Sequence, residues 1–209
     1  MPLKPQYGPT LGRLLAPRWH AAGHAARAIV IAVGVGLLAL AVGTVLTLLD
    51  SSFSHGGPVP FSFKYRGLYR TTPDPGGYVK VARRSNGRLE DSYAVAPLRV
   101  APYHGSVTGE LPVFSAGYER ALAGRFAGLR MEGEGRTRIS SSLVGYQVLY
   151  SVPVDGRKVY GRDVMLLPER PDVREGVVIE MLSVESASVS KPVANSGVLE
   201  RPLKTFAFG

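Results

Sequence analysis

The longest apolar stretch of the chain covers residues 28–49 and reads AIVIAVGVGLLALAVGTVLTLL. It contains no charge and no proline, and threonine is its only polar residue type. As a helix it would be roughly 33 Å long at about 1.5 Å per residue, enough to cross the ~30 Å hydrocarbon core of a bilayer. A helix packed on a soluble domain would show a polar face, and this segment shows none. The pattern therefore predicts a transmembrane helix over 28–49.

The flanking charges predict the orientation of this helix in the plasma membrane. Four cations precede it, at Lys4, Arg13, Arg18 and Arg27, and the first acidic residue is Asp50. Short flanks rich in Lys and Arg stay on the cytoplasmic side. We therefore expect residues 1–27 to form a basic cytoplasmic tail and residues 50–209 to lie outside.

A cleaved signal peptide is the alternative interpretation of the N-terminal segment. The apolar region of such peptides typically runs about 7–15 residues and precedes an A-x-A site, which is absent here. Ser52 and Ser54 do supply small residues at the required spacing, so the sequence leaves cleavage open.

Small residues recur at intervals of four within the apolar segment. They are Ala28, Ala32 and Gly36, followed by Ala39 and Gly43. A row of this kind lets a second helix approach closely, although small residues are common in any transmembrane segment. We interpret the row as a candidate surface for helix packing.

The remainder of the chain predicts an α+β domain over 59–184, between a Ser- and Gly-rich linker at 50–58 and a Ser-rich flexible tail at 185–209. Alternating apolar positions predict a mainly antiparallel sheet. The expected strands are 60–65, 78–82, one or two within 89–100, which Pro97 interrupts, and then 130–139, 144–154, 159–167 and 177–184, with 130–139 at an edge. Asp155-Gly156 predicts a tight hairpin, so the last three strands should pair in sequence order.

One principal helix is expected at 112–129. Phe114, Tyr118, Leu122 and Phe126 recur every fourth residue and would share a face. Pro112 suits a first helical turn. The tail, by contrast, ends in PLKTFAFG, whose Leu203, Phe206 and Phe208 suggest a final strand or a segment that docks on a partner.

The formal net charge of +9 is spread over many positions rather than concentrated. The densest group is Arg83, Arg84 and Arg88, around a Ser85–Gly87 turn. Nucleic-acid binding requires a concentrated basic stripe with aromatic residues, so we expect no nucleic-acid partner. The three arginines are a candidate contact for an anionic polymer, although a solvated turn explains them as well.

Catalytic motifs are absent from the sequence. It has no phosphate-binding loop, no dinucleotide fingerprint and no H-E-x-x-H motif. The absence of cysteine excludes a thiol nucleophile and thiolate metal ligands. His104 is the candidate base for a hydrolase, and Asp163 is interpreted as one of several charges in a solvated loop. We expect no cofactor and no metal site.

The order of the elements resembles the PsbP/Mog1-like fold. The segments that carry the resemblance are FSFKY, GYQVLY, the DG hairpin, VYGRDVMLLP and GVVIEML, within residues 59–184. The similarity is to small exported proteins of Gram-positive bacteria with high-G+C genomes. It implies an antiparallel sheet flanked by helices and a role in binding or assembly. The chain departs from that group in its Ser-rich tail and in lacking a cysteine for lipid attachment.

These observations predict a single-pass, membrane-anchored extracytoplasmic binding or assembly domain rather than an enzyme, such as an accessory subunit of a cell-envelope complex. Its expected partners are membrane lipid and another membrane or envelope protein, while the sequence leaves a small-molecule ligand undecided. The alternatives are an envelope hydrolase that uses His104 and a tether that binds anionic polymer through Arg83, Arg84 and Arg88.

Overall fold

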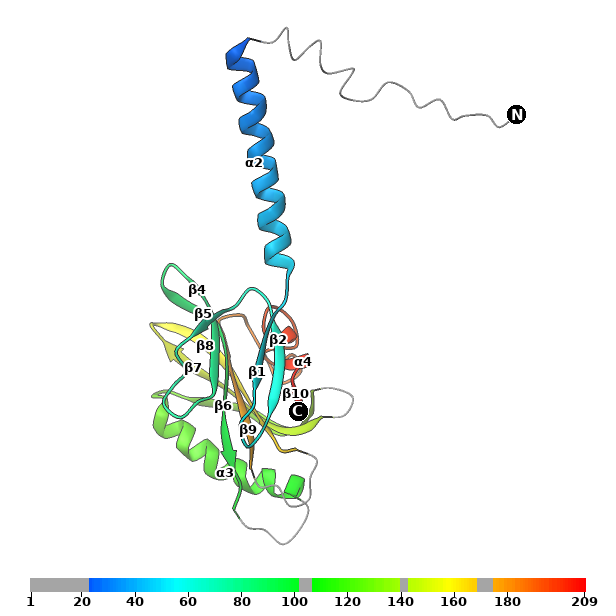
Figure 1. Ribbon diagram of the computed structural model, residues 1–209. Helices are drawn as coiled ribbons and strands as arrows, with labels where there is room; N and C mark the ends of the chain where they lie inside the picture. Colours follow the sequence, from blue (N-terminus) through cyan, green and yellow to red (C-terminus); the bar gives the residue numbers. More distant parts are fainter. Residues whose placement is uncertain (1–22, 102–106, 140–142, 169–174) are drawn as a thin grey trace, which may run out of the picture. The chain divides into compact units, whose positions relative to one another are not determined.

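The computed structural model describes residues 23–101, 107–139, 143–168 and 175–209 (Figure 1). The chain divides into two compact units, Met1–Leu49 and Asp50–Gly209. The first unit contains helix α2, His24–Leu48, so a helix at the predicted place is confirmed, and its crossing of a membrane stays a prediction. In the described part of the chain, no helix provides an apolar stretch of the length needed to cross a membrane. The side chains described inside 28–49 are those of 28, 29, 31–40 and 49.

The second unit is built on antiparallel sheets, which confirms the predicted α+β class. Within the described residues, a large sheet has the order β3-β4-β5-β9-β8-β7-β6 and a small one the order β1-β2-β10. The large sheet comprises β3 Tyr69–Thr71, β4 Val79–Ser85, β5 Arg88–Arg99, β6 Arg130–Arg138, β7 Val144–Val154, β8 Arg157–Leu166 and β9 Glu175–Ser183. The small sheet comprises β1 Ser51–His55, β2 Phe61–Tyr65 and β10 Ala207–Phe208. The helices are α3 Val107–Arg125 and α4 Glu200–Lys204.

Two hairpin turns follow from residues that tolerate a positive φ. Asp155 and Gly156 have φ values of 50° and 74°, and Asn86 and Gly87 have values of 50° and 77°. Both central residues of a type I′ turn need a positive φ, which Asn, Asp and Gly adopt most readily. The predicted antiparallel order β7-β8-β9 and the edge position of β6 are both confirmed.

Helix α3 packs on one face of the large sheet. Its Leu111 and Leu122 are buried against Val148 and Val152 of β7 and Met165 of β8, while Phe114, Tyr118 and Phe126 are partly buried in the same core. The predicted apolar face of the helix is therefore confirmed. Its predicted bounds are wrong by several residues, because α3 begins at Val107 and Pro112 lies inside it.

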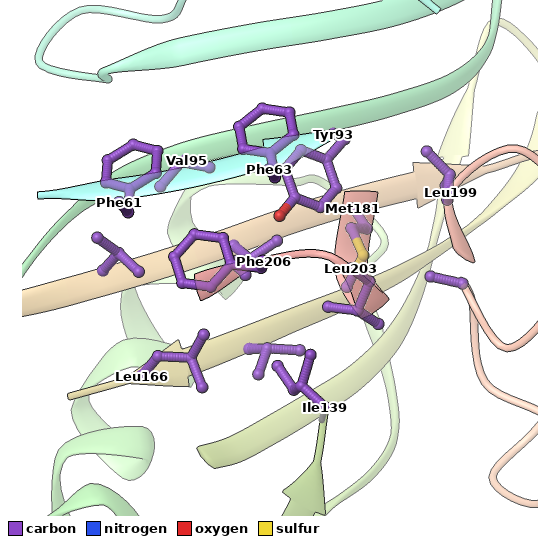
Figure 2. Close-up of a cluster of buried hydrophobic side chains, with 14 of the residues drawn as sticks. Phe61, Phe63, Tyr93, Val95, Ile139, Leu166, Met181, Leu199, Leu203 and Phe206 are labelled. Carbon is purple, nitrogen blue, oxygen red and sulfur yellow. The ribbon is translucent and has the colours of Figure 1, made fainter. Parts of the chain in front are cut away.

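The opposite face of the large sheet is covered by the small sheet and the C-terminal segment. Figure 2 shows Phe61 and Phe63 of β2 above Tyr93 and Val95 of β5, with Phe206 beside them. The ring centroids of Phe61 and Phe206 lie 5.5 Å apart, and those of Phe63 and Tyr93 lie 4.9 Å apart. Each face of the sheet therefore has its own hydrophobic core.

The structure corrects two predictions about segments that flank the domain. Residues 51–55, which were expected to belong to a flexible linker, form β1, and Phe53 packs 5.6 Å from Phe63 between ring centroids. The tail 185–209 was expected to be flexible, yet Leu203 and Phe206 are buried in the core and Phe208 is half-buried in β10. The prediction of a terminal strand is confirmed, and the strand joins the domain's own β2.

The Phe206→Ala substitution should destabilise the domain strongly. Removing a buried phenylalanine leaves a cavity and typically costs about 3–5 kcal/mol of unfolding free energy. Urea unfolding of residues 50–209 measures this loss, and Phe208→Ala is the matched control because Phe208 is only half-buried. Equal small effects of the two substitutions would show that the tail is not part of the core.

Candidate functional site

Four charged residues lie in one row of paired positions across the sheet face beneath α3. Paired positions on neighbouring strands share a face, and the row runs through Lys80, Ala94, Glu180, Asp163, Val148 and Glu134. Charges on a sheet face covered by a helix are uncommon, because burial of an ionised group requires compensating partners. The row therefore marks this face as the candidate site.

Asp163 lies at the centre of the row and is fully buried. The Tyr118 hydroxyl of α3 donates to Asp163 Oδ2 over 2.8 Å, and the Tyr150 hydroxyl of β7 donates to Oδ1 over 3.1 Å. Burial, assisted by the negative charge of Glu180, raises the pKa of Asp163 to about 8 even though both tyrosines favour its ionised form. Asp163 thus binds α3 to the middle of the sheet.

A chain of ion pairs continues from Asp163 towards the edge of α3. Arg125, at the end of the helix, donates to Glu180 Oε1 over 2.7 Å and to Oε2 over 3.2 Å. Its guanidinium also lies 3.6 Å from Asp74, which pairs with Lys80 at 3.1 Å. The bidentate bond to Glu180 raises the pKa of Arg125 above its ordinary value. These contacts link the helix, the sheet and the 73–77 loop.

A groove of about 260 Å³ opens beside this chain of ion pairs. Its apolar wall includes Val79, Ala94 and Ala96, and Asp74, Arg125 and Glu180 line it as charged groups. The small side chains of β5 leave the sheet uncovered here, between the end of α3 and the 73–77 loop. The groove combines a small apolar surface with charged groups of both signs, as ligand sites commonly do.

A second polar group lies under the first half of α3. The Ser115 hydroxyl, which is fully buried, donates to Glu134 Oε2 over 3.0 Å and to the Pro112 carbonyl over 2.8 Å. Burial, followed by the charge of Glu134 and a hydrogen bond with it, raises the pKa of Glu119. Ser115 and Glu134 bond to each other, whereas Glu119 Oε1 is buried without a hydrogen-bond partner among the described residues.

The three arginines that were predicted to contact an anionic polymer differ in their contacts. Arg83 Nε donates to Asp91 over 2.8 Å, so its charge is largely compensated by a buried carboxylate. Arg84 donates to the Gly87 carbonyl over 3.1 Å, and Arg88 is exposed at the same hairpin. The predicted turn is confirmed, and contact of the three arginines with an anionic polymer stays a prediction.

The remaining predicted site residues have varied positions. Ala28, Ala32, Gly36 and Ala39 are exposed along α2, and the surroundings of Gly43 lie outside the described side chains. Leu203 and Phe206 are buried in the domain's own core, and a role in docking on a partner stays a prediction. His104 lies outside the described residues.

Sequence reasoning missed the site because it placed Asp163 in a solvated loop, whereas the structure buries it in the middle of β8. One signal could have identified it, since Arg162 and Asp163 together interrupt an otherwise apolar run that ends in VMLL. Tyr118 was predicted only as part of an apolar helix face, although its hydroxyl needs a partner when buried. No protein-family model matches the chain, and neither does any curated protein sequence. The resemblance to the PsbP/Mog1-like fold stays a prediction.

The Asp163→Asn substitution should stabilise the domain at pH 7–8 and remove part of its pH dependence. The folded state holds a proton on Asp163 that the unfolded state loses near pH 3.8, so this residue's contribution to stability falls as pH rises towards 8. The maximum slope is about 1.4 kcal/mol per pH unit.

Urea unfolding of residues 50–209 between pH 5 and 8 measures the difference between the two proteins. Because the groups that the two proteins share titrate alike, their contributions cancel in this difference of unfolding free energies. A parent and variant whose stabilities change in parallel with pH would show that Asp163 is ionised throughout this range.

Proposed function

We propose that the chain is a single-pass, membrane-anchored protein whose residues 50–209 form an extracytoplasmic binding or assembly domain, as in an accessory subunit of a cell-envelope complex. The uninterrupted apolar sequence of 28–49, directly before a folded domain, is the observation that carries the proposal. Its length suits a bilayer, and the cations of residues 1–27 favour a cytoplasmic N-terminus.

The domain's site favours binding over catalysis. Asp163, Glu180, Arg125 and the two tyrosines form hydrogen bonds and ion pairs with one another, and these contacts fix α3 on the sheet. The floor of the groove beside them includes Ala94 and Ala96 of β5, a 12-residue interior strand of the large sheet. We propose this groove as the contact for an envelope protein partner.

Cysteine accessibility tests the anchor and its orientation, because the chain has no native cysteine. Single cysteines at Ser54, which is exposed on β1, and at Thr10 are labelled on intact cells with a membrane-impermeant maleimide. Only the Ser54 cysteine should react. Reaction only at Thr10 would show the opposite topology. Reaction at both positions, with the protein released from the membrane, would show that residues 28–49 do not anchor it.

Filling the groove tests the binding surface. Ala96→Leu adds bulk between α3 and the 73–77 loop and should reduce crosslinking from a photoreactive residue at Pro75 to a partner at least several-fold. Ala116→Leu, at an exposed position of α3, adds the same volume elsewhere and is the control. Equal crosslinking in the two variants, both folded by circular dichroism, would exclude the groove as the contact.

A further inference from the structure

Exposed cations gather at the end of the domain where the chain leaves the apolar segment. They are Lys64, Arg66, Arg70, Arg201 and Lys204, and we call them the basic rim. Antiparallel pairing places Ser51 opposite Tyr65, so Asp50 and Arg66 lie at the same end of the small sheet. The rim is thus contributed by β2, the β2–β3 turn, β3 and α4.

Specific contacts fix the basic rim around Asp50. Arg201 donates to Asp50 Oδ1 over 3.1 Å and forms a second, shorter bond to Oδ2. Thr205 at the end of α4 exchanges hydrogen bonds with the backbone of Lys64, at 2.9 and 3.1 Å. The Arg201 bond, with the charges of Arg201, Arg66 and Lys64, holds the pKa of Asp50 below its ordinary value.

The charge of the rim is only partly compensated by its acidic residues. Arg201 pairs with Asp50, and Lys204 pairs with Glu200 at 2.5 Å. Arg70 lies over the ring of Phe53, 5.1 Å from its centroid, and so remains near β1. Lys64 and Arg70 therefore contribute to a positive excess beside the start of the domain.

An exposed aromatic residue accompanies these cations. Tyr69, next to Arg70 on β3, exposes 74% of its surface, while the neighbouring Leu68 is buried. Tyrosine is stable at the level of lipid headgroups, where its ring is partly desolvated and its hydroxyl stays hydrated. A positive surface with an exposed tyrosine, close to the first strand after the apolar segment, matches the chemistry of an anionic membrane surface.

We propose that the basic rim rests on anionic phospholipid headgroups of the membrane that holds residues 28–49. This inference rests on the proposed anchor and adds a second, electrostatic contact between the domain and the lipid. The covalent chain keeps the rim close to the bilayer, because Asp50 directly follows the apolar segment and β1 begins at Ser51. The contact would hold the domain in one orientation on the membrane and so fix the direction in which the groove faces.

Fluorescence quenching in nanodiscs tests this contact with the full chain. A single cysteine at Thr71, an exposed position beside Arg70, carries a fluorophore, and headgroup-nitroxide lipid is the quencher. Discs contain phosphatidylcholine alone or with phosphatidylglycerol. Quenching should be greater in the anionic discs and should fall at high salt, because ionic screening weakens the attraction.

The charge variant Lys64→Gln with Arg70→Gln should abolish the additional quenching. Each cation removed weakens association with an anionic surface roughly fivefold, so the pair should weaken it roughly 25-fold. Arg136→Gln with Arg138→Gln on edge strand β6 makes the same change in net charge and should leave the quenching intact. A label at Val113 of α3, which packs on the other face of the large sheet, should remain unquenched.

Equal quenching in neutral and anionic discs, or no effect of the Lys64 and Arg70 substitutions, would overturn the proposal. Retention of the chain on the discs at high salt reports the anchor separately. Loss of retention would reject the proposed function itself. Retention without charge-dependent quenching at Thr71 would reject only the contact between the basic rim and lipid.

Discussion

The fold depends on burial of both faces of the large antiparallel sheet. One face is covered by α3, and the other by a layer assembled from the two ends of the domain. Phe61 and Phe63 enter that layer from the first residues after α2, and Phe206 enters it from the last. Neither end forms this layer alone, because β2 is the central strand between β1 and β10. The start of the domain is therefore tied to its C-terminus.

This arrangement bears on the anchor proposed at residues 28–49. Helix α2 ends at Leu48, and the first strand of the domain, β1, begins at Ser51. Asp50 is held by Arg201, and that bond connects the beginning of the domain to α4. On the opposite face, Asp163 and Glu180 fix α3, whose end forms one side of the groove. A rigid domain of this kind suits a role in positioning a partner.

The regular elements of the fold could be predicted from the sequence because they follow local rules. Period-two alternation identified β7, β8 and β9, and the Asp155-Gly156 turn fixed their pairing. The spacing of Phe114, Tyr118 and Leu122 identified the buried face of α3, although not its start. The first turns of α3 could not be predicted, because residues near Pro112 are small and no apolar periodicity precedes it.

Features that depend on contacts between distant residues could not be predicted. The serines around Phe53 suggested a linker, since the partner of that strand, FSFKY, is recognised only when the two pair. The tail was predicted to be mobile because its serines precede the anchoring residues Leu203 and Phe206. Asp163 was assigned to solvent because its tyrosine partners come from α3 and β7. The groove could not be predicted, because it depends on where α3 ends relative to β5 and no local sequence pattern indicates that position.

Hydrogen–deuterium exchange of the full chain in lipid nanodiscs tests most directly the central claim that β1 belongs to the folded domain and that the proposed anchor at 28–49 precedes it. The account predicts slow exchange of backbone amides throughout 28–49, through shielding by lipid, and in the hydrogen-bonded positions of β1 and β2. Rapid exchange of 51–55 while β2 remains protected would show that a linker exists. Rapid exchange within 28–49 would show that the segment does not lie in the membrane.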